Sequence, residues 1–138
     1  MSAVKYLRQI EKMDILIKSK EAEIRNLNEI ATSITVALKD VAVQTSGAGD
    51  KIGDCASKIV DLQNDLQKDI EDYCAIKKDI LSKITQLNTN EYLVLYKRYF
   101  ESKQFGDIAN EMYFSREHIY RLHKRALKNL EKMLHHVT

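Results

Sequence analysis

Apolar side chains recur at alternating spacings of three and four residues along the first forty positions of the chain. Lys20 is the one polar member of the series. The positions are Ala3, Tyr6, Ile10, Met13, Ile17, Lys20, Ile24, Leu27, Ala31, Ile34, Leu38 and Val41. This spacing is typical of a heptad seam, so it predicts one long helix, on the order of 60 Å, that packs along its length against a partner.

A second seam of similar length follows, and it again contains one polar residue, Asp69. Its positions are Cys55, Ile59, Leu62, Leu66, Asp69, Tyr73, Ile76, Ile80, Ile84 and Leu87. Small and polar residues separate the two seams, so we expect a loop at about residues 44–53. The simplest closure is an antiparallel hairpin with Leu38 near Ile59 and Ile17 near Ile80.

Lys20 and Asp69 do not face each other in that register, and we interpret them separately as register-setting or solvent-reaching side chains. Further apolar residues lie beside the seams and stay available for other contacts. They are Ile15, Ile30, Val36, Ile52, Val60 and Ile70. We therefore expect a third partner helix or self-association, with a homodimer through the hairpin favoured.

The pattern changes after residue 86 to short amphipathic helices. Asn88 is a candidate helix cap, and Glu91 stands at the third helical position, as in a capping box. The spacing predicts one helix from Glu91 to about Phe100 and another from Phe105 to Met112. A third helix begins after Ser115, which is a second candidate cap.

The last two of these helices have the pattern of a helix-turn-helix. Ala109 is small enough for a close helix crossing, Phe114 can plug the turn, and Ile119 faces inward. Leu122, Ala126 and Leu127 continue the buried face. The opposite face carries Arg, Glu, Tyr and Lys side chains that suit the major groove of DNA, where Arg can bind guanine and Glu can accept from cytosine.

Composition supports this interpretation. The chain of 138 residues has no proline and four glycines, which suits an almost wholly helical protein. The net charge is −1 over residues 1–86 and +3 over residues 87–138, so the basic excess coincides with the helix-turn-helix. No apolar run has the length of a membrane span, and no signal peptide is recognisable, so we expect a cytoplasmic protein.

The remaining candidate chemistry is sparse. Cys55 and Cys74 would lie roughly 28 Å apart on one helix, too far for a disulfide within the chain, and we expect two reduced thiols. No Cys and His spacing is typical of a zinc site. We interpret His118 and His123 as surface residues or phosphate contacts. We expect no catalytic residue, no metal site and no cofactor.

Residues 87–130 resemble region 4 of the sigma-70 family, which reads the promoter −35 element. The resemblance is carried by Glu91, the segment 95–99, and the runs 107–109, 115–119 and 125–130. It implies that Arg116, Glu117, Tyr120 and Arg121 face base edges. The backbone contacts are expected from Ser115, His118, Lys124, Arg125 and Lys128. The whole chain also resembles ArpU-type regulators of phages, which are connected with late-gene transcription.

These observations predict an all-α protein with two domains. Residues 1–86 would form a long antiparallel coiled-coil helical hairpin, and residues 87–138 a sigma-region-4-like helix-turn-helix domain. The expected function is sequence-specific binding of double-stranded DNA by a phage or prophage transcriptional activator in a bacterial host, with RNA polymerase as a further partner. Two alternatives stay open: a small-terminase-like DNA-packaging protein, and a polymerase-binding adaptor that does not read DNA.

Overall fold

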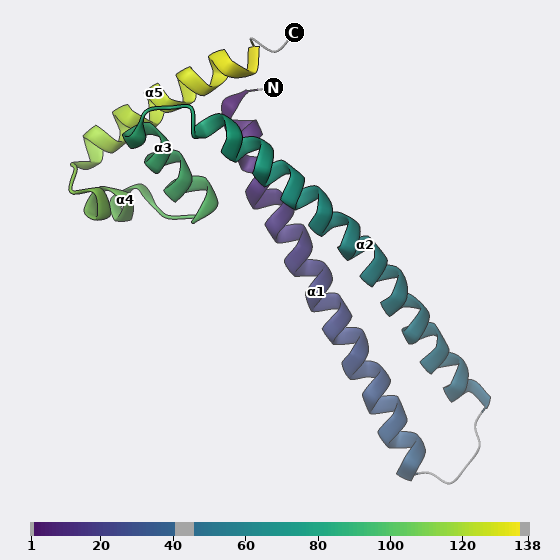
Figure 1. Cartoon of the computed structure of the whole chain (residues 1–138). Coiled ribbons are helices and arrows are strands. Elements are labelled where there is room, and N and C mark those ends of the chain that lie inside the picture. The colour runs from purple at the N-terminus through teal and green to yellow at the C-terminus, as the bar shows by residue number, and fades with distance from the viewer. Residues whose placement is uncertain (1, 41–45, 136–138) are drawn as a thin grey trace. The chain divides into compact units, whose positions relative to one another are not determined.

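The computed structural model describes residues 2–40 and 46–135, and these ranges are almost entirely helical, without a β-strand (Figure 1). The elements are α1 (Ala3–Asp40), α2 (Ser46–Ile84), α3 (Thr89–Leu95), the π-helical turn η1 (Tyr96–Phe100), α4 (Phe105–Met112) and α5 (Arg116–His135). The all-α class is confirmed, as is the order of two long helices followed by a smaller helical region. None of the helices in the described ranges is long and apolar enough to cross a membrane.

The chain divides into two compact units that do not meet at residue 86. The terminal unit combines Met1–Asp14 with Tyr73–Thr138, and the hairpin unit is Ile15–Asp72. The first turns of α1 and the last turns of α2 belong with the short helices because they share a hydrophobic core with α5. That core contains Leu7, Ile80, Ile84, Leu95 and Leu130.

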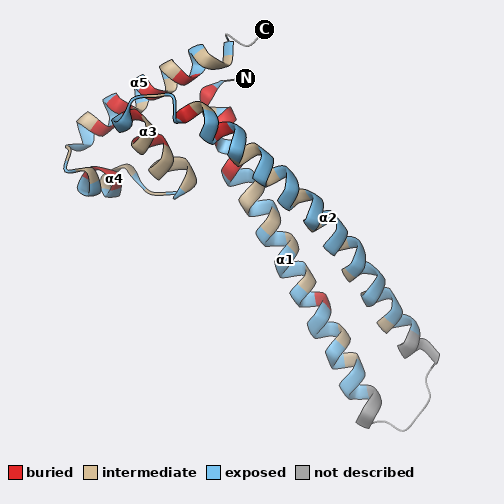
Figure 2. Cartoon of the chain, viewed as in Figure 1, coloured by how far each residue is buried: buried red, intermediate tan, exposed pale blue. Residues whose placement is uncertain are grey.

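In the hairpin unit, α1 and α2 run antiparallel beside each other (Figure 1). The seam positions of this unit from Ile17 to Ile34 and from Cys55 to Asp69 are all at least partly buried, as the heptad pattern predicts. Two helices cover only one stripe of each other, however, and among the described residues of this unit Leu27 is the one buried apolar side chain (Figure 2). The expected exposure beside the seam is confirmed for Ile15, Ile30, Val36, Val60 and Ile70, whereas Ile52 is partly buried.

The hairpin differs from the expected one in its loop bounds, in its polar seam residues and in its register. Residues 46–53 are helical and belong to α2, although we expected them in the loop; residues 41–45 lie outside the described ranges. Lys20 and Asp69 form an ion pair, so the two polar seam residues do face each other. This pair places α1 and α2 in a register shifted from the expected one, so that the two polar interruptions of the seams lie together.

In the terminal unit, the last turns of α2 pack against the first turns of α1. Ile80 belongs to the same buried cluster as Tyr6, Leu7 and Ile10, and Ile17, its neighbour in the expected register, is not a member of that cluster. The Tyr6 hydroxyl donates to Asp79 Oδ2 at 2.5 Å, and Lys83 Nζ donates to both Asp79 oxygens at 2.9 Å. Burial, together with Asp79, raises the pKa of Tyr6, while the bonds from Tyr6 and Lys83 lower the pKa of Asp79. These bonds fasten α1 to α2.

Candidate nucleic-acid interface

The helix-turn-helix consists of α4, a three-residue connection and α5. Tyr113 ends α4 in the left-handed backbone region, with φ at 57°. The chain then reverses, and the Phe114 N–H donates to the Ala109 carbonyl at 3.0 Å. Ser115 Oγ accepts from the His118 N–H at 3.1 Å, which confirms Ser115 as the cap of α5. The turn therefore satisfies backbone groups at the end of α4 and at the start of α5, and it fixes the direction of α5 relative to α4.

A separate hydrophobic cluster holds α4 and α5 together. Its buried members are Val94, Ile108, Ala109, Ile119 and Leu122, and Phe105, Met112 and Phe114 pack against it. Ala109 and Ile119 were predicted as the crossing residue and the inward-facing residue, and both are buried. Val94 comes from α3, so this helix also packs against the crossing of α4 and α5.

The four residues that the resemblance assigns to base edges all lie exposed on the first two turns of α5: Arg116, Glu117, Tyr120 and Arg121. The side chain of Tyr120 is half exposed, because its ring lies 4.9 Å from the ring of Phe105. Phe105 therefore limits the directions in which Tyr120 can reach. Arg116 and Glu117 belong to the first turn of α5, where the helix dipole favours an anion.

The residues expected at the DNA backbone differ in their surroundings. Ser115, Lys124 and Lys128 are exposed, while His118 is half-buried, with its ring edge against Phe114 at 4.5 Å. Arg125 is exposed, but its Nε lies 3.8 Å from a carboxylate oxygen of Glu91. Lys124 and Lys128 thus have the clearest access to a phosphate.

Glu91 is a structural residue whose role differs from the expected one. Asn88 caps α3 by accepting from the Glu91 N–H at 2.9 Å, as predicted. The Glu91 carboxylate does not complete a capping box, however. It is 2% exposed and accepts from Asn129 Nδ2 at 3.1 and 3.2 Å. A buried carboxylate with a tertiary donor and Arg125 nearby ties α3 to α5, because leaving it unpaired would be costly.

His123 is not a surface residue, contrary to the sequence-based interpretation. Its Nε2 lies 2.9 Å from the Tyr99 hydroxyl, and its ring lies edge-on to Phe105 at 4.9 Å. Burial, helped by the charge of Arg98, lowers the pKa of His123 to about 4. The ring is therefore neutral at pH 7 and serves as a packing and hydrogen-bonding group between α5 and η1.

Sequence reasoning missed the neighbours of Arg116. Its guanidinium lies over Gly106 at the start of α4, where a Cβ on Gly106 would come within 2.6 Å of Nη2. Arg98, Gln104, Phe105 and Tyr120 line the same depression. The signal was present, since Gly106 is the one glycine outside the segment 47–53. Its partner could not be identified without the fold.

Among residues 2–40 and 46–135, no cluster of three or more His, Cys, Asp or Glu side chains could hold a metal ion. Cys55 and Cys74 are both free thiols. What the described surface offers around α5 is a set of hydrogen-bond donors and positive charges on a rigid helix.

Comparison with known proteins finds similarity in this part of the chain. Residues 84–132 match the family described as Sigma-70, region 4. The chain is also similar to the RNA polymerase sigma factor SigO of Bacillus subtilis (strain 168), at 29% identity over 92 residues that cover 63% of this chain and 49% of that protein. The chain thus spans about half the length of this curated relative. No solved structure matches the chain.

The resemblance to sigma-70 region 4 is therefore confirmed, and it coincides with the helix-turn-helix that the structure shows. The matched range begins at the last residue of α2 and ends within α5. It includes the capped turn and the exposed row on α5. It also includes the residues that α3 and α5 contribute to the two hydrophobic clusters. The long α1 lies outside it.

Proposed function

Because residues 84–132 form a sigma-70 region 4-like helix-turn-helix, we propose that the chain is a non-enzymatic, sequence-specific regulator of transcription that binds double-stranded DNA. The observation that carries the proposal is the exposed row Arg116, Glu117, Tyr120 and Arg121 on a helix whose opposite face is fully packed. A rigid helix with free donors and one acceptor at its N-terminal end suits the major groove.

In this proposal, the first turns of α5 enter the groove. Arg116 donates its guanidinium fork to guanine, and Glu117 accepts from a cytosine amino group. Tyr120 and Arg121 contact the adjacent base edges. Lys124 and Lys128, together with Ser115, His118 and Arg125, contact phosphates and hold α5 in register. Arg125 does so while it stays near Glu91.

The biological setting is part of the same proposal. The resemblance to ArpU-type proteins supports a phage or prophage activator of late genes that acts in the cytoplasm of a bacterial host. The similarity to a protein described as an RNA polymerase sigma factor supports polymerase as a second partner. The exposed Ile15, Val36 and Val60 support homodimerisation through the hairpin unit.

Selection of binding sites from random DNA duplexes tests the central claim. We expect an enriched motif with the intact chain. On the selected site, Arg116→Ala should cost about 1–3 kcal/mol and relax the preference at one position, whereas Lys128→Ala should weaken all duplexes alike and reduce the salt dependence by about one phosphate contact. Lys51→Ala, on an exposed turn of α2, is the matched control and should bind like the parent chain.

Each alternative has its own outcome. Intact protein that enriches no motif but still binds polymerase would favour an adaptor, and the DNA-reading function would be wrong. Equal losses for Arg116→Ala and Lys128→Ala on specific and random duplexes would contradict the assigned roles. A mass measurement that gives a ring of many subunits would favour DNA packaging, whereas a regulator should be a monomer or a dimer.

A further inference from the structure

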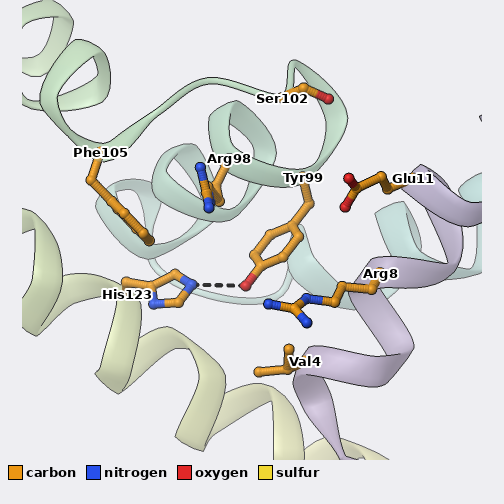
Figure 3. A pocket seen from close by; sticks show the side chains of 8 residues that line it. All are labelled: Val4, Arg8, Glu11, Arg98, Tyr99, Ser102, Phe105 and His123. Carbon is orange, nitrogen blue, oxygen red and sulfur yellow. Dashed lines mark hydrogen bonds between the residues drawn. The ribbon is translucent and has the colours of Figure 1, made fainter.

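A cavity of about 250 Å³ lies within the terminal unit, between α1 and the helix-turn-helix. Its charged and aromatic side chains come from four separate elements (Figure 3). They are Arg8 and Glu11 of α1, Arg98 and Tyr99 of η1, Phe105 of α4 and His123 of α5. Arg8 and Glu11 lie outside the range that matches sigma-70 region 4, so the cavity is not a feature of the matched domain alone.

Two guanidinium groups dominate its charge. In the view of Figure 3, Arg98 and Arg8 lie on either side of the Tyr99 side chain. Both also act on the same hydroxyl, since burial raises the pKa of Tyr99 while the charges of Arg98 and Arg8 oppose the rise. Glu11 supplies one negative charge, and His123 is neutral at pH 7. The lining therefore has an excess of positive charge.

Arg98 is held in place before any ligand arrives. Its Nη1 donates to the Lys103 carbonyl at 2.9 Å, and its guanidinium carbon lies 4.6 Å from the centre of the Phe105 ring. A guanidinium has five N–H donors, so this one bond leaves donors for a ligand. Arg8 forms no ion pair or hydrogen bond through its side chain within residues 2–40 and 46–135. One arginine is thus preorganised and the other is free to close on a ligand.

From this arrangement we propose that the cavity binds a phosphate group, gripped by Arg8 and Arg98, with the Tyr99–His123 pair as its polar wall. A carboxylate has two oxygens, which one guanidinium fork satisfies, whereas a phosphate offers further oxygens to a second fork. Small phosphorylated molecules fit the volume of the cavity. A DNA backbone phosphate is the second source of the same group, because Arg98 and Phe105 also line the depression that holds Arg116.

Titration of the intact chain with pyrophosphate tests the site without DNA. The measurement is the NMR shift of the His123 ring and of the amides around Tyr99, in chloride buffer at constant ionic strength. We expect saturable binding that Arg8→Ala weakens at least tenfold and that Glu11→Gln strengthens several-fold. Both residues are exposed, so neither change should disturb folding. Arg25→Ala, also exposed on α1 but in the hairpin unit, is the matched control and should not alter binding.

Arg8→Lys separates a guanidinium grip from simple charge attraction. The lysine keeps the charge but loses the planar fork, so we expect a loss close to that of Arg8→Ala. Absence of saturable shifts at millimolar pyrophosphate would overturn the proposal. An equal loss for Arg8→Ala and Arg25→Ala would overturn it too, because nonspecific charge would then explain the binding.

Duplex binding by the same variants identifies the source of the phosphate. If the group belongs to DNA, Arg8→Ala should weaken binding to the selected duplex and lower the salt slope by about one contact. If it belongs to a small molecule, Arg8→Ala should bind the duplex like the parent chain while pyrophosphate binding is lost. Either result keeps the phosphate site. Its failure in the titration would leave the proposed reading of DNA by α5 intact, because pyrophosphate binding does not involve that face.

Discussion

The two compact units differ in how their helices are stabilised. The terminal unit contains nearly all the buried apolar side chains of the described chain, in two clusters that join segments distant in sequence (Figure 2). The hairpin unit has two helices of similar amphipathic pattern but buries Leu27 alone among its described apolar side chains. The same heptad pattern therefore produces a firm core only where a third helix covers it.

This difference matters for function because the proposed DNA-reading face and the phosphate cavity both belong to the terminal unit. Rigid support reduces the entropy lost when side chains bind a groove. The hairpin unit instead offers exposed apolar and charged surface, which suits contacts with another protein. The following changes, in order of decreasing effect, test this contrast.

Cavity-creating substitutions should distinguish the units most strongly. Ile119 is fully buried between α4 and α5, so Ile119→Ala should reduce the free energy of unfolding by about 2–5 kcal/mol. Ile24→Ala, at a half-exposed seam position, should cost about 1 kcal/mol because water already reaches that side chain. Urea denaturation measures both values. Equal losses would show that the hairpin unit is packed as tightly as the terminal unit.

The pH dependence of stability should come partly from His123. Its pKa is about 4 in the folded chain against 6.5 for an ordinary histidine, so the folded state favours the neutral ring. Its contribution to stability is complete above pH 6.5 and is lost progressively as the pH falls towards 4. Urea midpoints across this range should fall more steeply for the parent chain than for His123→Gln. His135→Gln, on an exposed turn, should follow the parent curve, and a parallel curve for His123→Gln would contradict the assignment.

The ion pair between Lys20 and Asp69 should set the register of the hairpin unit more than its stability. Both side chains keep partial access to water, which can solvate the lysine once its partner is removed, so Asp69→Ala should cost about 1 kcal/mol. Replacing both residues by leucine should restore or increase stability while it permits other registers. Distance measurements between spin labels on α1 and α2 should broaden in the double variant. A single narrow distance would show that apolar packing alone sets the register.

A glycine at Tyr113 should have the smallest effect and the opposite sign. This residue is 94% exposed with φ at 57°, a region that disfavours side chains with a Cβ. Tyr113→Gly relieves that cost but adds freedom to the unfolded chain, so stability should rise by up to about 1 kcal/mol. Thermal melting measures the change, with Tyr120→Gly inside α5 as a control that should destabilise. A loss of stability for Tyr113→Gly would indicate that the tyrosine packs in solution.

The local features of the fold were predictable because neighbouring residues create them. Seam spacing gave both long helices, and the bounds of α4 followed from Phe105, Ile108, Ala109 and Met112. Asn88 and Ser115 were recognised as caps because their side chains bond to backbone groups three residues away. The exposed row on α5 followed from the same periodicity, so its location needed no tertiary information.

The sequence by itself thus determined the helices, their caps, the helix-turn-helix and the outward face of α5. Only the tertiary structure decided the register of α1 against α2, since a heptad seam repeats and several registers bury similar side chains. The tertiary structure also decided that Glu91 accepts a hydrogen bond from Asn129 and that His123 is hydrogen-bonded to Tyr99. It placed Arg8 in the lining of the same cavity as Arg98. The residues brought together in these three cases are at least 24 positions apart in the chain, and local patterns carry no information about neighbours at that separation.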